Sequence, residues 1–256
     1  MKLAITGKGG VGKSTLAAAL ALLLAERNRR VLAVDADPDA NLAACLGMPP
    51  EKQRRIVPIA ARRALVEERT GAKARQFGQI FKINPDVSDI ADHYAVAHNG
   101  VALLVLGAIE GGATGCACPE NVLLKSLVSE LILRGSDTLI LDMEAGLEHL
   151  GRATARGVDT MLVVVEPGQR SIDSARRIRR MASQIGIPRV VAVANKIASA
   201  DDEQFVRRSL DDYELVGAIP YSEDLRNTDR PGRSVLDGAP PAIGAVFAQV
   251  LETIEA

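Results

Sequence analysis

The residues best suited to chemistry form one loop near the start of the chain, Gly-Lys-Gly-Gly-Val-Gly-Lys-Ser at positions 7–14. Their spacing fits the phosphate-loop pattern G-x-x-x-x-G-K-[ST]. Glycines let a backbone wrap around phosphates, and the N-terminus of a following helix adds positive potential. We expect Lys13 to reach the β- and γ-phosphates of a nucleotide and the Ser14 hydroxyl to ligate Mg²⁺. The expected nucleotide contacts in this loop are Gly9, Gly10, Val11, Gly12, Lys13, Ser14 and Thr15.

Acidic residues lie at the ends of two predicted strands, Arg30–Asp35 and Thr138–Asp142. Asp37 follows the first of these strands, and period-two spacing puts it on the same side of the chain as Asp35. Ligands of a parallel sheet bind beyond the carboxyl ends of its strands. A carboxylate there can hold Mg²⁺ through water or position an attacking water. We therefore expect Asp37 and Asp142 to be catalytic.

The pair Asn195-Lys196 ends a third predicted strand and bears on the identity of the base. Guanine-specific proteins need an acid two residues beyond such a lysine, and Ala198 cannot serve as one. The amide of Asn195 can still bond N6 and N7 of adenine. The sequence therefore favours ATP, with Asn195 at the base.

Two closely spaced cysteines, Cys116 and Cys118, precede a predicted helix over Pro119–Arg134. The helix dipole favours a thiolate at this position. Two thiolates can bind Ni²⁺ or Zn²⁺, but a tetrahedral thiolate site needs four ligands. A second copy of the chain related by a twofold axis supplies the missing pair most simply. Two incidental thiols or a redox-active disulfide are the alternatives, and Cys45 is expected to be a core residue.

Apolar, β-branched runs alternate with helical patterns along the chain. The predicted strands are Lys2–Thr6, Arg30–Asp35, Val101–Leu106, Thr138–Asp142, Thr160–Glu166, Arg189–Asn195 and Glu214–Ile219. The predicted helices are Thr15–Glu26, Pro119–Arg134, Gln169–Ile185, Asp202–Leu210 and Ile243–Ile254. Strands that are apolar throughout and separated by helices indicate a parallel sheet covered on both faces.

The pattern predicts an α/β fold, in which residues 1–256 form a single P-loop ATPase domain. Its mostly parallel sheet of seven to eight strands is flanked by helices. A helical insertion is expected around residues 49–100. Within it, residues 52–75 are strongly basic, which indicates either a solvated helical face or a docking face for an acidic partner.

Composition excludes several classes of protein. The 256 residues carry a net charge of −1, and aromatic residues make up only 3%, so nucleic-acid binding is not expected. No apolar run approaches the roughly 20 residues of a membrane span, and no secretory signal is visible. Three cysteines without such a signal indicate the reducing cytoplasm. We therefore expect a cytoplasmic protein with no membrane partner.

The loop contains an additional lysine, Lys8, which points to a particular group of ATPases. Lys-Gly-Gly-Val-Gly-Lys-Ser-Thr over residues 8–15 resembles the deviant Walker A motif of the MinD/ParA/ArsA/nitrogenase-iron-protein group. The resemblance implies that Lys8 reaches across a homodimer to the partner's nucleotide, whereas Lys13 acts in its own protomer. It also implies that Asp37 and Asp142 lie in the two nucleotide-sensing segments.

The cysteine pair narrows this resemblance to one family within the group. Cys-Ala-Cys-Pro over residues 116–119 and Asp-Met-Glu-Ala-Gly over residues 142–146 are similar to motifs of the CooC-type accessory ATPases of carbon monoxide dehydrogenase. That family implies an ATP-dependent homodimer that binds nickel or zinc through Cys116 and Cys118 and inserts nickel into a client enzyme. The alternatives are a ParA/MinD-type partitioning or positioning ATPase and an iron–sulfur reductase resembling the nitrogenase iron protein.

Overall fold

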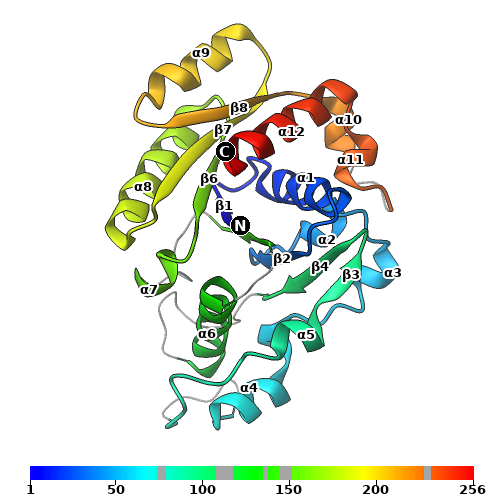
Figure 1. The fold of residues 1–256 in the computed structure, drawn as a ribbon, viewed down its shortest axis with the longest axis vertical. Coiled ribbons are helices and arrows are strands. Elements are labelled where there is room, and N and C mark those ends of the chain that lie inside the picture. Colours follow the sequence, from blue (N-terminus) through cyan, green and yellow to red (C-terminus); the bar gives the residue numbers. More distant parts are fainter. Residues whose placement is uncertain (74–78, 108–117, 135–137, 145–151, 228–231) are drawn as a thin grey trace.

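An eight-stranded sheet lies between two layers of helices in the computed structural model (Figure 1). The structure describes residues 1–73, 79–107, 118–134, 138–144, 152–227 and 232–256. The predicted α/β single domain with a mostly parallel sheet is confirmed, and all seven predicted strands are present. Cys116 lies outside the described residues.

The sheet has the strand order β3-β4-β2-β5-β1-β6-β7-β8, and every pairing is parallel except that of β3 with β4. The strands are β1 (Lys2–Thr6), β2 (Val31–Ala36), β3 (Val96–His98), β4 (Val101–Val105), β5 (Thr138–Met143), β6 (Thr160–Val165), β7 (Arg189–Ile197) and β8 (Glu214–Pro220). The sequence does not predict β3, a three-residue edge strand joined to β4 by a tight turn.

Helices connect the strands and cover both faces. They are α1 (Lys13–Glu26), α2 (Leu42–Cys45), α3 (Pro50–Gln53), α4 (Arg63–Thr70), α5 (Ile90–Tyr94), α6 (Pro119–Arg134), α7 (Arg152–Ala155), α8 (Gln169–Ile185), α9 (Ala200–Ser209), α10 (Glu223–Arg226), α11 (Val235–Gly238) and α12 (Pro241–Glu255), with a 3₁₀ turn η1 (Ile59–Ala61). The predicted bounds of α6 and α8 match the structure. Helix α1 begins at Lys13, two residues before the predicted start, because the phosphate loop turns directly into it.

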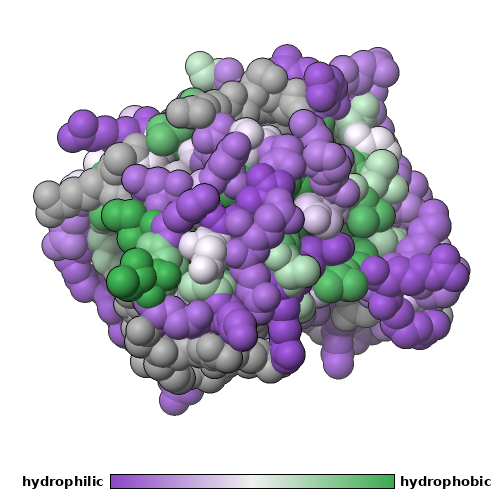
Figure 2. All heavy atoms as spheres, turned by 90° about the horizontal axis from the view of Figure 1, so that it is seen from below, coloured by the Kyte–Doolittle hydropathy of each residue, from purple (hydrophilic) through white to green (hydrophobic). Residues whose placement is uncertain are grey.

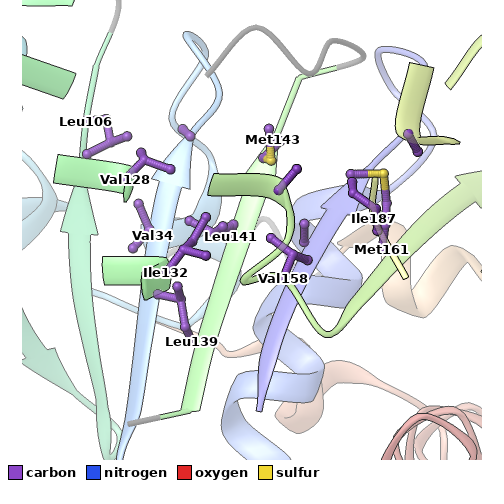
Figure 3. Close-up of a cluster of buried hydrophobic side chains, with 14 of the residues drawn as sticks. Val34, Leu106, Val128, Ile132, Leu139, Leu141, Met143, Val158, Met161 and Ile187 are labelled. Carbon is purple, nitrogen blue, oxygen red and sulfur yellow. The ribbon is translucent and has the colours of Figure 1, made fainter. Parts of the chain in front are cut away.

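The apolar side chains of each strand alternate between two cores. On one face, Ile140 of β5 joins the core formed with α1 and α12, which includes Leu16 and Phe247. On the other face, Leu139 and Leu141 of the same strand lie in a second core. There they point toward α6, as Figure 3 shows for its residues Val128 and Ile132. Burial on both faces explains why residues 139–141 of β5 are all apolar and do not alternate between polar and apolar residues.

The described part of residues 49–100 contains α3, η1, α4, α5 and β3, and both η1 and α4 pack on α6. Two basic side chains of the 52–75 stretch hold the segment together. Arg69 forms an ion pair with Asp89 at 2.8 Å, and the Arg62 guanidinium lies 4.2 Å from the centroid of the Tyr94 ring. The remaining described basic residues there are mostly exposed, namely Lys52, Arg54, Arg55, Arg63 and Lys73.

The surface seen from below is mostly hydrophilic, with hydrophobic residues in separate patches (Figure 2). Within the described ranges, no helix combines the length and the apolar character that crossing a bilayer requires.

Candidate nucleotide-binding site

The chemically active residues meet at one edge of the sheet because five neighbouring strands, in the order β2-β5-β1-β6-β7, all end there. The phosphate loop leaves the central strand β1, which lies between β5 and β6. The acids of β2 and β5 lie opposite each other in the register, Asp35 against Asp142. On the other side of the loop, Glu166 follows β6 and Asn195 lies near the end of β7.

Two glycines give the phosphate loop its shape. A Cβ at Gly7 would lie 2.4 Å from the Val164 carbonyl oxygen, so the loop leaves β1 in close contact with β6. Gly12 has a φ of 96° and precedes the first turn of α1, a conformation that side-chain-bearing residues rarely adopt. A Cβ there would lie 2.4 Å from Nδ2 of Asn195. The loop therefore needs both glycines to approach its neighbours.

Asn195 is buried and supports the loop directly. Its Nδ2 donates to the Val11 carbonyl at 2.7 Å, and its Oδ1 accepts from the backbone N–H of Lys196 at 2.8 Å. An amide has two N–H groups and two acceptor lone pairs, so one donor and one acceptor remain. This contact is a role that the sequence did not reveal, and the predicted adenine contact requires the remaining groups.

Lys13 and Asp37, two of the predicted catalytic residues, are direct neighbours. Lys13 is the first residue of α1, and its Nζ lies 3.3 Å from Oδ2 of Asp37. The lysine side chain is only 6% exposed and the aspartate 13%, so bulk water screens this pair weakly. The structure thus brings the cation of the phosphate loop and the acid after β2 to one point.

Asp35 holds the segment that carries Asp37. Its Oδ2 accepts from the Leu42 N–H at 2.9 Å, and its Oδ1 accepts from the Asp37 N–H at 3.3 Å. Burial raises the pKa of Asp35 to about 6, although these two hydrogen bonds lower it in part. Asp35 is thus a fully buried positioning residue for the loop between β2 and α2.

Asp142 is a fully buried acid with two oxygens that lack a regular hydrogen bond among the described residues. Burial raises its pKa to about 7. The Ser14 hydroxyl lowers the pKa, without reaching regular hydrogen-bond geometry, and the nearby Asp35 raises it. Unpartnered buried carboxylate oxygens beside a serine hydroxyl form an oxygen donor set of the kind that Mg²⁺ prefers. These residues therefore fit a magnesium ion.

Lys8 contacts its own protomer. Its Nζ lies 3.3 Å from Oε1 of Glu166, the residue that follows β6. The other carboxylate oxygen of Glu166 lies 3.4 Å from Nζ of Lys196. Lys196 also donates from Nζ to the Gly10 carbonyl at 2.6 Å. The sequence places Glu166 and Lys196 at the ends of predicted strands, but it does not predict the contacts of either side chain with Lys8 or with the loop.

The remaining predicted contacts lie on the same loop. Gly9 and Gly10 are exposed, Val11 is buried, and Ser14 and Thr15 are half-buried on the first turn of α1. The Thr6 hydroxyl donates to the Glu144 carbonyl at 2.8 Å, which ties the end of β1 to the segment after β5.

Of the predicted metal-binding pair, Cys118 is half-buried and directly precedes α6, where its carbonyl accepts from the Val122 N–H at 3.1 Å. Its companion Cys116 lies outside the described residues. The described residues contain no group of three or more His, Cys, Asp or Glu side chains that could hold a metal ion. Cys45 is half-buried against the core that contains α1.

Comparison with known proteins gives one consistent picture. A family model described as the CobQ/CobB/MinD/ParA nucleotide binding domain matches residues 2–235. The chain is 40% identical over 257 residues to the carbon monoxide dehydrogenase accessory protein CooC of Rhodospirillum rubrum, with 99% of this chain and 97% of that protein covered. It is 42% identical to an ATP-binding protein of Methanocaldococcus jannaschii, with 92% and 91% covered.

Solved structures show the same fold. A chain of the MinC:MinD cell division protein complex of Aquifex aeolicus matches with a TM-score of 0.69 at 22% identity, covering 100% of this chain and 96% of that one. A ParA family ATPase from Chlorobium tepidum matches with a TM-score of 0.70 at 20% identity, covering 100% and 98%. At these identities the likeness concerns the fold alone.

Proposed function

This chain belongs to the CobQ/CobB/MinD/ParA nucleotide-binding family and is a CooC-like ATP-binding ATPase, and on that premise we propose that it inserts nickel into a carbon monoxide dehydrogenase or a related nickel enzyme. One observation carries the proposal. The 40% identity to the CooC accessory protein extends over nearly the whole of both chains. A shared nucleotide loop alone does not produce similarity of that extent.

In this proposal the phosphates of ATP bind to the backbone N–H groups of residues 9–15, with Lys13 at the β- and γ-phosphates. Ser14 and Asp142 would hold Mg²⁺, which neutralises phosphate charge when bound. Asp37 would position the attacking water. Its 3.3 Å contact with Lys13 supports that role, because it puts the acid beside the cation expected at the γ-phosphate. Asn195 would contact the adenine with its remaining amide groups.

We propose that two copies of the chain form the working ATPase, with Lys8 of each copy reaching the nucleotide of the other. The Lys8 side chain is 39% exposed at the nucleotide edge, so a second copy docked there has access to it. ATP would thus favour a closed homodimer, and hydrolysis would favour its opening.

The nickel ion is the cargo of this cycle, and Cys116 and Cys118 of both copies are its proposed ligands, with Zn²⁺ accepted by the same thiolates. Topology supports a link to the nucleotide. Helix α6 connects the parallel strands β4 and β5, so it runs against them and begins at the edge where they end. Cys118, directly before α6, therefore lies at the sheet edge that also carries Asp142.

Metal analysis of anaerobically purified protein tests the proposal. With four thiolates needed per ion and two per chain, we expect about one nickel ion per two chains. The C116A/C118A variant should lose that nickel and keep its affinity for ATP. The C45A variant is the matched control, because it removes the third thiol from a half-buried site next to the core and should keep the metal. Nickel retained by C116A/C118A would contradict the proposal.

A further inference from the structure

Three charged side chains form a bridge along the rim of the phosphate loop. Glu166 contacts Lys8 through one carboxylate oxygen and Lys196 through the other, at 3.3 and 3.4 Å. Lys196 in turn donates to the Gly10 carbonyl. The bridge therefore connects the loop to the ends of β6 and β7.

The backbone fixes two of the three members of this bridge, Glu166 and Lys196. The Glu166 N–H donates to the Ser171 hydroxyl at 3.1 Å, and its carbonyl accepts from the Gly168 N–H at 2.7 Å, so the residue is held at the start of α8. Lys196 has a φ of 60°, a left-handed conformation that is uncommon for residues other than glycine. Such conformations persist where the surroundings enforce them and are concentrated at functional sites.

We infer that Glu166 is a positioning residue that retains Lys8 on its own protomer, and that Lys196, bound to the other oxygen of the same carboxylate, weakens that hold. The inference rests on the proposed function, in which Lys8 must leave this contact to reach the partner's nucleotide. When Lys8 leaves, Lys196 still neutralises the Glu166 carboxylate, so that carboxylate is not left unpaired. Glu166 thus restrains Lys8, and Lys196 makes its release easier.

The magnitude of this restraint follows from exposure. The Lys8 and Lys196 side chains are 39% and 42% exposed, so both ion pairs are weakened by water. Pairs of this kind contribute modestly, and we expect changes of about two- to fivefold in the measured equilibria. An effect of this size tunes association and does not abolish it.

The test uses two variants with opposite expected effects. In E166Q the carboxylate charge is lost, so Lys8 is released and the protomers should associate more tightly with a non-hydrolysable ATP analogue. In K196M the second cation on this carboxylate is lost, so Glu166 holds Lys8 more firmly and association should weaken. K196R keeps the positive charge and should restore the wild-type value. Sedimentation measures the dimer dissociation constant. Binding of a fluorescent ADP analogue to each variant shows whether losing the Lys196 contact with Gly10 weakens nucleotide binding itself, which distinguishes that effect from a change in Lys8 release.

A second readout needs no dimer. Amine-reactive labelling of nucleotide-free monomer, quantified for Lys8 by mass spectrometry, should be faster in E166Q and slower in K196M. E203Q, which removes an exposed ion pair to Arg207 on α9, is the matched control and should leave Lys8 labelling unchanged. Unchanged Lys8 labelling in E166Q, or a shift of both variants in one direction, overturns the inference. A wild-type protein that stays monomeric with the ATP analogue instead contradicts the proposed homodimer.

Discussion

The acid at the end of β5 gives the sharpest quantitative prediction, because burial opposes its ionised form. The pKa of Asp142 rises from an ordinary 3.8 to about 7 in the folded protein. Between these two values the folded state binds a proton that the unfolded state has released, so the free energy of unfolding falls as pH rises. At 1.36 kcal/mol per pKa unit, the loss above pH 7 is of the order of 4 kcal/mol.

Replacing Asp142 by Asn removes this titration and nearly preserves the shape of the side chain. The amide also has no regular partner at this site, which costs stability equally at every pH. The slope with pH is therefore the informative quantity. We expect the stability of D142N relative to wild type to rise by about 4 kcal/mol from pH 4 to pH 8. Asp35 titrates over part of the same range and repels the ionised Asp142. The difference between the two proteins therefore removes the contribution of Asp35 alone and retains the coupling between the two acids.

Urea denaturation of nucleotide-free wild type and D142N at one-unit pH intervals measures this difference. D211N, which removes an exposed acid after α9, controls for the loss of one negative charge. Excess Mg²⁺ with ADP should stabilise wild type at pH 8 and stabilise D142N less, because the metal then lacks a carboxylate. A stability difference between D142N and wild type that does not change from pH 4 to pH 8 would refute the assigned electrostatics of Asp142.

Three further outcomes are expected from the same site. G12A should lower the melting temperature and weaken nucleotide binding, because a φ of 96° at residue 12 costs alanine about 1–2 kcal/mol and the added Cβ would meet Asn195. Calorimetry compares this variant with G9A, in which the added Cβ meets nothing within 4 Å. N195A should cost about 1–3 kcal/mol in urea denaturation because the Val11 carbonyl loses its donor, and an unchanged stability would count against that hydrogen bond. EDTA should stop ATP hydrolysis and excess MgCl₂ should restore it in a phosphate-release assay; turnover that persists in EDTA would exclude the magnesium requirement.

Most of the fold could be predicted because its strands have a distinctive composition. A strand such as β5, buried on both faces, shows as an uninterrupted apolar run, and the acid that ends it marks the edge of the sheet. The edge strand β3 has no such signature, since all three of its residues are partly or fully exposed. Its signal lies instead in the turn, where Asn99 and Gly100 both have positive φ, the conformation of a type I′ hairpin. An Asn-Gly pair before β4 was therefore the evidence for a hairpin.

The residues of the site fall into two groups, those that the sequence identifies and those that only the fold brings together. Residues whose role follows from the backbone could be recognised, because the loop at residues 7–14 uses its own glycines, N–H groups and helix terminus. Glu166 could not be recognised, because its role depends on strand order. It lies 158 residues from Lys8, and the two meet only because β6 is inserted beside β1. Asn195 reaches the loop across 184 residues for the same reason, through β7. The sequence of a phosphate loop thus specifies what it can bind, whereas the neighbouring strands determine which charges restrain it. Variation at the ends of β6 and β7 is therefore where we expect relatives with the same loop to differ in how readily Lys8 is released.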